Sequence, residues 1–381
     1  MKNNSTVEIS GSLISYFSNK VKLHGGLNLA QGIPGFTPPV KLLDILSEIR
    51  FENYHQYAPG TGNNNLLKAI ENMYPEKEES TRIFITSGAT EAISLIYTYL
   101  ERKLKGKLKV LSFSPAYESY IHLPKIFGNE FFSYPVNDEN LFDKSEFEKF
   151  FVNNNIKLLF VASPGNPYGK TLSKEHIEFL KDLVERNNAY LIIDAVYSSL
   201  YFNGEKPYHP TGAITPNVFY INSFSKRFSV TGWRVGYMFM HEKHFKEISY
   251  IHDYIGLSSA APFQQALALF LNTPEAKKYE EYLREQTTEN LISASEKLNI
   301  NNFRCPKIDG GYFIWAELPE HINDSLQFGI ELYDNARTAI IPGVHFGDEW
   351  NNYIRINIAR DSAELNAGID SIIEFSKKAR I

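Results

Sequence analysis

Short, continuous apolar segments recur through the middle of the chain and predict the strands of a buried sheet. They lie at residues 83–86, 109–113, 158–162, 190–193, 218–221 and 235–240. Most are apolar at nearly every position, as parallel strands covered on both faces must be. The intervening segments are long enough for helical crossovers, so we predict an α/β fold with a mostly parallel, doubly wound sheet.

Helical spacing of apolar residues predicts helices at about 65–73, 91–104 and 173–186, the last with a serine at its N-cap. The first thirty residues are weakly patterned, and residues 27–36 are expected to be extended. After residue 274 a long polar helix (275–298) precedes apolar segments at 312–315, 339–343 and 353–358 and a terminal helix at 362–377. We therefore predict a large domain at 41–274 and a smaller α+β domain built from both termini, namely residues 1–40, which include an N-terminal arm, and 275–381.

Composition narrows the class of protein. The chain has 381 residues, 43% of them hydrophobic and 22% charged, which is typical of a soluble globular protein of two domains. A net charge of −5 argues against nucleic-acid binding. The single cysteine, Cys305, cannot form an internal disulfide. The chain starts without an apolar signal core and has no run of 18 apolar residues, so we expect a cytoplasmic protein with no membrane span, and we predict no metal site.

Lys226 stands just past the end of a predicted strand, among small hydroxylated residues. Open α/β sheets bind their ligands at this position. Burial there lowers the pKa of an amine, and a partly neutral amine can form a Schiff base with a carbonyl. Ser223, Ser225 and Arg234 offer hydroxyl and guanidinium groups suited to a phosphate. Together these residues suggest pyridoxal phosphate, and the alternative is a surface loop with a solvated lysine.

Two other strand ends carry polar groups that a pyridine ring would use. Asp194 directly follows four apolar residues, where a carboxylate is costly unless it is paired. It would pair with a protonated ring nitrogen. Asn166 and Tyr197 would hydrogen-bond the phenolate oxygen of the ring, and Tyr117 would stack on its face. The alternatives are a helix cap or structural ion pair for Asp194 and a core position for Tyr117.

The turn at residues 87–90 leads from a predicted strand into a predicted helix. Such a turn presents backbone N–H groups and the positive end of the helix dipole to an anion. The sequence therefore offers a phosphate seat there, although many strand-to-helix turns look alike and bind nothing.

Five motifs in order carry a resemblance to a known family. They are Gly-Ala-Thr at 88–90, Asn-Pro-x-Gly at 166–169, Asp-x-x-Tyr at 194–197, Ser-x-Ser-Lys followed by Thr-Gly-Trp-Arg at 223–234, and the late arginine Arg355. Over nearly its whole length the chain resembles the class I/II, pyridoxal-phosphate-dependent aminotransferases of fold type I. The family order and spacing of these motifs are reproduced.

The resemblance implies a role for each matching residue. Lys226 corresponds to the lysine that binds the cofactor and shuttles the proton, assisted by Asp194 and Tyr197. The phosphate would be held by Gly88, Ala89, Thr90, Ser223 and Arg234. Tyr57 is similar to a tyrosine that reaches the phosphate of the neighbouring subunit, which implies a homodimer with shared active sites. Arg355, with Gly32 and Asn166, would hold the α-carboxylate of the substrate.

Three positions depart from the family pattern: Gly35 where Asp is common, Tyr168 where Thr is common and Ala195 where Glu is common. None of them is a cofactor ligand in that pattern. Residues 30–34 and 87–92 look most like the methionine/kynurenine/glutamine aminotransferase branch, and the sequence places no second arginine for an acidic side chain. We therefore expect transfer of an amino group from a large apolar or aromatic L-amino acid, such as methionine, to a 2-oxo acid.

Three alternatives remain open at this point. A carbon–sulfur β-lyase would use the same fold and cofactor, and an aspartate-type aminotransferase would use the same chemistry on another substrate. A non-catalytic effector-sensing domain is a third possibility, although such domains are usually fused to a DNA-binding module and only ten residues precede the predicted fold.

Overall fold

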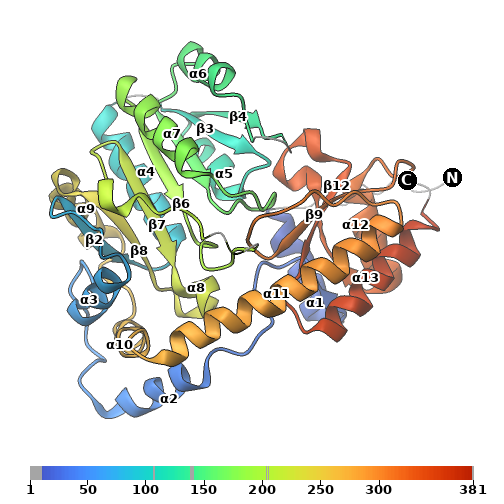
Figure 1. Cartoon of the computed structure of the whole chain (residues 1–381), viewed down its shortest axis with the longest axis horizontal. Helices are drawn as coiled ribbons and strands as arrows, with labels where there is room; N and C mark the ends of the chain where they lie inside the picture. The colour runs from blue at the N-terminus through green and yellow to red at the C-terminus, as the bar shows by residue number, and fades with distance from the viewer. Residues whose placement is uncertain (1–10, 106–107, 138–140, 203, 205, 380–381) are drawn as a thin grey trace. The chain divides into compact units, whose positions relative to one another are not determined.

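The computed structural model of the chain describes residues 11–105, 108–137, 141–202, 204 and 206–379. The chain forms two compact units (Figure 1). The large unit comprises Gly35–Gln286 and Ile308–Gly311, and the small unit comprises Met1–Pro34, Thr287–Lys307 and Tyr312–Ile381. The first ten residues of the predicted N-terminal arm lie outside the described part, and the domain limits at 40/41 and 274/275 stay a prediction.

The large unit contains a seven-stranded sheet in the order β2-β8-β7-β6-β5-β3-β4. Its strands are β2 (Thr81–Thr86), β3 (Lys109–Ser114), β4 (Glu130–Pro135), β5 (Leu158–Ala162), β6 (Tyr190–Asp194), β7 (Val218–Ser223) and β8 (Gly236–His241). Only β8 runs against its neighbours, and the other pairs in the sheet are parallel. All six predicted strands are confirmed. The additional strand, β4, lies at the edge, where its partly exposed residues give no continuous apolar run.

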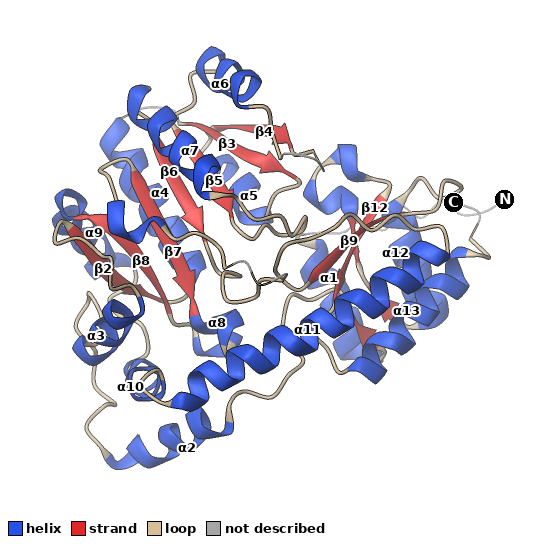
Figure 2. Ribbon diagram, in the orientation of Figure 1, coloured by secondary structure: helices blue, strands red, loops and turns tan. Residues whose placement is uncertain are grey.

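Alternate residues of the central strands pack into two separate apolar cores. In β5, Leu159 and Val161 contribute to one core, whereas Leu158 and Phe160 contribute to the other. Helices α4 (Ala89–Leu104), α5 (Glu118–Ile126) and α9 (Glu242–Ile255) cover the second face (Figure 2). Helices α2 (Val40–Glu48), α3 (Asn64–Met73), α6 (Lys144–Asn153), α7 (Lys174–Arg186) and α10 (Ala261–Phe270) supply the first core. This burial on both faces explains why the strands are apolar at nearly every position.

The register of the sheet brings the functional loops to one edge. Ala162 at the end of β5 is paired with Asp194 at the end of β6, and Asp194 is paired with Ile221 in β7. These strands are parallel, so the loops that follow them begin next to one another. This is the edge at which open α/β sheets bind ligands.

The small unit is built around the antiparallel sheet β11-β12-β9. Its strands are β9 (Phe313–Glu317), β11 (Ile341–Pro342) and β12 (Tyr353–Asn357), while β1 (Leu27–Asn28) pairs in parallel with β10 (Thr338–Ala339). The segment predicted at 339–343 therefore forms two short strands. The helices are α1 (Leu13–His24), α12 (Ser325–Ala336), α13 (Ser362–Ser376) and the C-terminal part of α11 (Pro274–Ile300), whose first half belongs to the large unit.

Across the described ranges, no helix is both long enough and apolar enough to cross a membrane.

Candidate active site

The carboxylate of Asp194 is buried at the carboxyl end of β6, with 5% of the residue exposed. Tyr120 Oη donates to Asp194 Oδ2 at 2.6 Å, and the Val196 N–H donates to Oδ1 at 3.1 Å. Burial raises the pKa of Asp194 to about 6, while these two hydrogen bonds and the positive charge of Lys226 lower it. Asp194 begins no helix, so the alternative of a helix cap is excluded.

Tyr120 is a member of this group that the sequence reasoning missed. It lies in the first turn of α5, is 2% exposed, and stacks on Phe160 with ring centroids 4.8 Å apart. The sequence signal that could have identified Tyr120 is its spacing of one helical turn from Tyr117. Tyr117 is half-buried at the N-cap of α5 and packs edge-to-face against Tyr120. The structure therefore places both tyrosines beside the buried carboxylate.

Lys226 lies in the short helix α8 (Phe224–Arg227), directly after β7. Ser223 caps this helix, because its Oγ accepts from the Ser225 N–H at 3.1 Å. Lys226 is half-buried, and its positive charge partly opposes the rise in the pKa of Asp194 that burial causes. Its role as the residue that binds the cofactor stays a prediction.

Gly88 and Arg234 form a compact anion cradle at the start of α4. Pairing of Thr86 with Gly236 across β2 and β8 brings the two segments together. Arg234 Nη2 donates to the Ser87 carbonyl at 3.1 Å, and Nη1 donates to the Thr231 carbonyl at the same distance. Gly88 has a φ of 81°, and a Cβ at this position would lie 2.5 Å from Arg234 Nη2. Only glycine therefore lets the guanidinium approach the N-terminus of α4 this closely.

Contacts of Glu91 with neighbouring side-chain and backbone groups fix the first turn of α4. Glu91 accepts a hydrogen bond from the Ser87 N–H and lies 3.6 Å from Nε2 of the buried His252. Burial raises the pKa of Glu91, but its contacts with His252 and Ser87 outweigh this effect and lower the pKa overall. On the same turn, Ala89 is half-buried and Thr90 is exposed. The helix start can therefore present its N–H groups to an anion.

Asn166 and Tyr197 lie on the loops after β5 and β6 and are 8% and 5% exposed. Tyr168 shapes the Asn166 loop, because its ring packs against Gly165 and its Oη donates to the Ala162 carbonyl at 3.3 Å. Tyr168 belongs to the apolar core of the large unit, and burial raises its pKa. This departure from the family pattern therefore fills the core beneath the loop.

In the small unit, Arg355 and Gly32 are brought together by one face of β12. Arg355 is 1% exposed, donates to the Ala30 carbonyl at 2.8 Å, and lies 4.2 Å from the centre of the Phe313 ring. Asn357, two residues along the same face, donates to the carbonyls of Gln31 and Ile33. The segment containing Gly32 is thus fixed beside the buried guanidinium. A surface ion pair is excluded for Arg355.

Tyr57 differs from these residues because 83% of it is exposed. It lies on the loop between α2 and α3 of the large unit. The structure thus leaves its ring on the surface.

The large unit fits pyridoxal phosphate on two observations. The buried Asp194 carboxyl group, whose pKa burial raises to about 6, suits a cationic ring nitrogen that would stabilise its ionised form. The cradle at Gly88 and Arg234 joins a helix N-terminus to a guanidinium, which is a combination suited to a phosphate.

Comparison with known proteins settles the family. The family model for class I and II aminotransferases matches residues 24–372. The chain belongs to this family. An aspartate aminotransferase from Pyrococcus horikoshii is 27% identical over 365 residues, covering 93% of this chain and 92% of the relative. A probable aspartate aminotransferase from Methanocaldococcus jannaschii is 29% identical, covering 92% and 93%. The structure of N-succinyldiaminopimelate aminotransferase from Mycobacterium tuberculosis superimposes with a TM-score of 0.87 at 24% identity, covering 96% and 97%.

This class I/II aminotransferase is therefore an enzyme of fold type I that uses pyridoxal phosphate and acts on amino acids and 2-oxo acids. An aromatic-amino-acid aminotransferase from Thermococcus litoralis is also similar, at 24% identity over 94% of each chain. The relatives thus differ in substrate, and the predicted methionine/kynurenine/glutamine branch is not distinguished by them.

Gly88→Ala tests the cradle. The added methyl group must displace the Arg234 guanidinium, so we expect pyridoxal phosphate to bind about tenfold more weakly, as for the loss of one charge-assisted contact. Gly232→Ala is the matched control, because a Cβ there meets nothing within 4 Å. Absorbance titration of the cofactor-free proteins measures both affinities. Equal affinities of the Gly88 variant and wild type would contradict the assignment.

Asp194→Asn tests the burial of the carboxylate in the cofactor-free protein. Burial raises the pKa of Asp194 in the folded protein to about 6, whereas its ordinary pKa, which applies to the unfolded chain, is 3.8. Between these values the folded state binds more protons, so the contribution of Asp194 to stability falls as pH rises. We expect the free energy of unfolding of wild type to fall relative to the variant by about 2 kcal/mol between pH 4 and pH 7.

Thermal unfolding of both proteins at several pH values measures this difference. Asp44→Asn, on the exposed side of α2, controls for removing a carboxylate in general. A difference between wild type and the Asp194 variant that stays constant with pH, or that changes in the opposite direction, would show that the carboxylate is not buried as described.

Proposed function

We propose that the enzyme transfers an amino group from an L-amino acid with a large apolar or aromatic side chain, such as methionine, to a 2-oxo acid. One observation supports the catalytic assignment. The buried Asp194 carboxylate accepts a hydrogen bond from Tyr120 and interacts electrostatically with Lys226. The substrate preference is supported by the likeness of residues 30–34 and 87–92 to the methionine/kynurenine/glutamine branch and by the lack of a second arginine placed for an acidic side chain.

Lys226 is proposed as the catalytic base and acid. When bound, pyridoxal phosphate supplies an electron-withdrawing ring that eases loss of the proton from the substrate α-carbon. The Lys226 amine would hold the cofactor, be released by the substrate amine, and then move the proton at the α-carbon. Asp194 would keep the ring nitrogen protonated, and Tyr197 would hydrogen-bond the phenolate oxygen and tune its basicity.

The remaining predicted residues would bind and orient. Gly88, Ala89, Thr90, Ser223 and Arg234 would bind the phosphate group, and Tyr117 would stack on the ring. Asn166 would hydrogen-bond the phenolate oxygen and assist in binding the substrate. Arg355, with Gly32, would bind the α-carboxylate through its guanidinium fork. Holding the substrate in one orientation selects which bond at the α-carbon is broken.

We also propose a cytoplasmic homodimer in which Tyr57 reaches the cofactor phosphate of the partner. Its ring is 83% exposed, as an aromatic contact to a second subunit would be in an isolated chain. The proposal keeps a large domain at 41–274 and a small domain formed by 1–40 and 275–381.

A second candidate is an aspartate-type aminotransferase. It is favoured by two relatives at 27% and 29% identity, one named an aspartate aminotransferase and the other a probable aspartate aminotransferase. At this identity the residues around the substrate side chain can differ while the catalytic residues are retained, so the substrate must be measured.

Lys226→Ala tests the catalytic assignment. We expect wild type loaded with pyridoxal phosphate to show a visible absorption band that the variant lacks. The rate of the half-reaction should fall at least about a thousandfold, since the general base is removed. The control is Lys278→Ala, which changes an exposed lysine in α11. This variant should keep the visible absorption band and the rate of the half-reaction. An unchanged band and rate in the Lys226 variant would reject the assignment.

A screen of amino donors tests the substrate. The absorbance change of the half-reaction is followed with methionine, phenylalanine, tyrosine and aspartate, and we expect kcat/KM for methionine or an aromatic donor to exceed that for aspartate at least about tenfold. A preference for aspartate establishes the second candidate instead. Release of pyruvate from cystathionine without an amino acceptor would establish a β-lyase.

A further inference from the structure

A histidine is buried in the large unit beside the turn at which α4 begins. His252 lies in the last turn of α9 and is 1% exposed. Among the residues that the structure describes, neither of its ring nitrogens has a hydrogen-bond partner. Its ring packs edge-to-face against Phe84 of β2, with ring centroids 4.9 Å apart. Burial of a polar side chain without hydrogen bonds is costly, so the position of this imidazole needs another source of stability.

The carboxylate of Glu91 supplies that source. Its Oε2 atom lies 3.6 Å from Nε2 of His252, and the same oxygen accepts a hydrogen bond from the Ser87 N–H. The Glu91 side chain is 19% exposed. Burial raises its pKa, but the contacts with His252 and Ser87 lower the pKa by more. Glu91 is therefore an ionised carboxylate at neutral pH, although it is largely buried.

The end of α9 is shaped to hold this pair. A Cβ at Gly256 would overlap Oε1 of Glu91 and would lie 2.8 Å from Nε2 of His252, so only glycine lets the chain pass this close to both groups. The His252 carbonyl accepts from the N–H groups of Gly256 and Leu257 at 2.9 and 2.8 Å. The carboxyl end of a helix carries partial negative charge, which favours a cation at this position.

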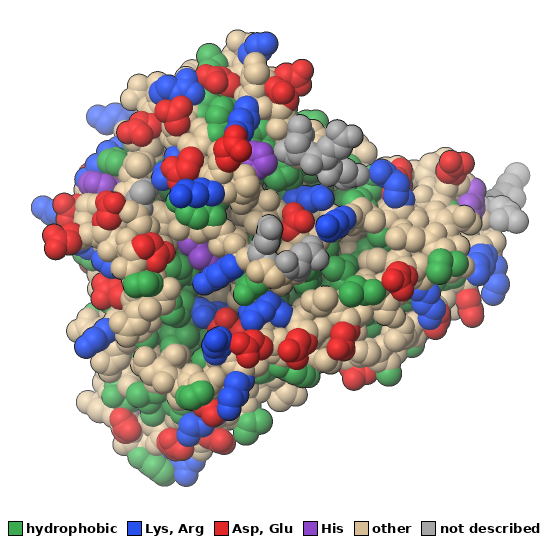
Figure 3. Space-filling model, viewed as in Figure 1, with side chains coloured by type: hydrophobic (Ala, Val, Ile, Leu, Met, Phe, Trp, Pro, Cys, Tyr) green, Lys and Arg blue, Asp and Glu red, His purple; other side chains and the backbone are tan. Residues whose placement is uncertain are grey.

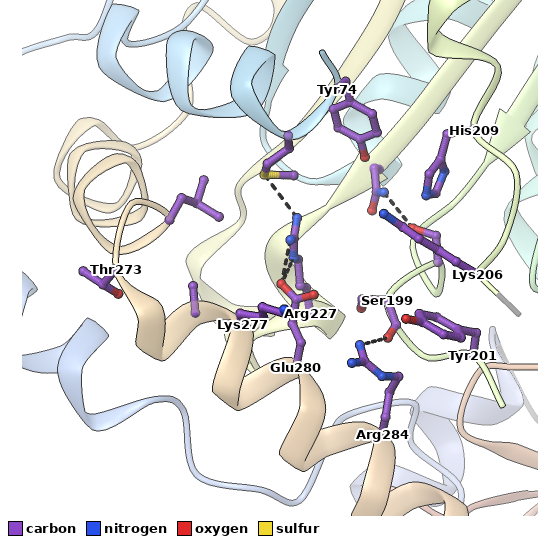
Figure 4. Close-up of a pocket in the computed structure, with 15 residues that line it drawn as sticks. Tyr74, Ser199, Tyr201, Lys206, His209, Arg227, Thr273, Lys277, Glu280 and Arg284 are labelled. Carbon is purple, nitrogen blue, oxygen red and sulfur yellow. Dashed lines mark hydrogen bonds and ion pairs between the residues drawn. The ribbon is translucent and has the colours of Figure 1, made fainter. Parts of the chain in front are cut away.

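The cation of this pair differs from that of other ion pairs in the chain. On the face shown in Figure 3, acidic side chains lie among Lys and Arg at the surface, where water solvates them. Glu280 is largely buried and is paired with Arg227 at 2.6 Å, beside a cavity of about 360 Å³ (Figure 4). An arginine is a permanent cation, whereas a histidine is a cation only when both ring nitrogens are protonated. The net charge at Glu91 therefore depends on the proton of His252.

This net charge matters because Glu91 belongs to the proposed phosphate-binding turn. Its hydrogen bond fixes the Ser87 N–H, while Arg234 Nη2 donates to the Ser87 carbonyl at 3.1 Å. The two contacts together orient the peptide groups that lead into α4. A carboxylate in the first turn of this helix would repel a phosphate dianion unless its own charge were balanced.

We propose that His252 is a positioning residue for the cofactor, because as an imidazolium it balances the Glu91 carboxylate beside the phosphate. The inference rests on the proposed binding of the phosphate at residues 87–90. Glu91 then holds the turn through Ser87 without repelling the phosphate. His252 is buried and acts through Glu91.

The experiment compares pyridoxal phosphate with pyridoxal, which lacks the phosphate group. Absorbance titration of the cofactor-free protein gives a dissociation constant for each compound, and the ratio of the pyridoxal value to the pyridoxal phosphate value measures the contribution of the phosphate. His252→Gln leaves the Glu91 carboxylate without its balancing charge, so we expect this ratio to fall about tenfold. Glu91→Gln removes the charge and keeps an oxygen that can accept from the Ser87 N–H, so the ratio should not fall below that of wild type.

The double variant Glu91→Gln/His252→Gln separates charge balance from packing. Both groups are then neutral, so the ratio should return close to the wild-type value. If His252 had only a packing role, the second substitution could not restore what the first removed. The matched control is His122→Gln, which makes the same change at an exposed position of α5 and should leave the ratio unchanged. Thermal unfolding confirms that each variant is folded.

The proposal is overturned if His252→Gln leaves the ratio unchanged, or if the double variant binds pyridoxal phosphate no better than His252→Gln. If the His252 variants do not fold, Glu91→Gln still decides. A lower ratio in that variant would show that the carboxylate charge assists phosphate binding, which overturns the proposal, whereas a ratio at or above that of wild type supports it. If wild type binds the two compounds equally, the phosphate site at residues 87–90 is itself rejected, and this inference with it.

Discussion

The arrangement of the candidate site in the large unit depends on one group, the Asp194 carboxylate, which is buried at the end of β6. Burial raises the pKa of Asp194 to about 6, against the opposing effect of the hydrogen bonds from Tyr120 and Val196 and the charge of Lys226. A cation at the same place would stabilise the ionised carboxylate. The parallel register of β5, β6 and β7 fixes this group among the loops that carry Asn166, Tyr197 and Ser223. The proposed chemistry at Lys226 depends on this arrangement.

Three arginines have different interaction partners, and these partners determine whether the guanidinium charge is neutralised. Arg234 donates to two backbone carbonyls, which orient its guanidinium at the start of α4 without neutralising it. Arg355 is held by the Ala30 carbonyl and the Phe313 ring in the small unit, which presents a guanidinium from apolar surroundings. Arg227, in contrast, is neutralised by an ion pair with Glu280. Two of the three are positioned in a way that suits an anionic group of a cofactor or substrate.

Much of the large unit could be predicted because its central strands are apolar on both faces. The edge strand β4 could not, because its partly exposed residues produce no such run, and the reversed direction of β8 has no signature in its composition. Lys226 and Asp194 stand at strand ends, where local sequence shows them. Tyr120 lies inside a helix, and its role depends on a contact 74 positions along the chain.

The central claim is that the Lys226 amine, beside the Asp194 carboxylate, is the group that binds pyridoxal phosphate. Treatment of the loaded protein with borohydride fixes the cofactor to its amine, and peptide mass spectrometry then locates it. The account predicts that the added mass lies on the peptide containing Lys226, at close to one cofactor per chain. Attachment to a different lysine, or loss of the cofactor from every peptide, would contradict it.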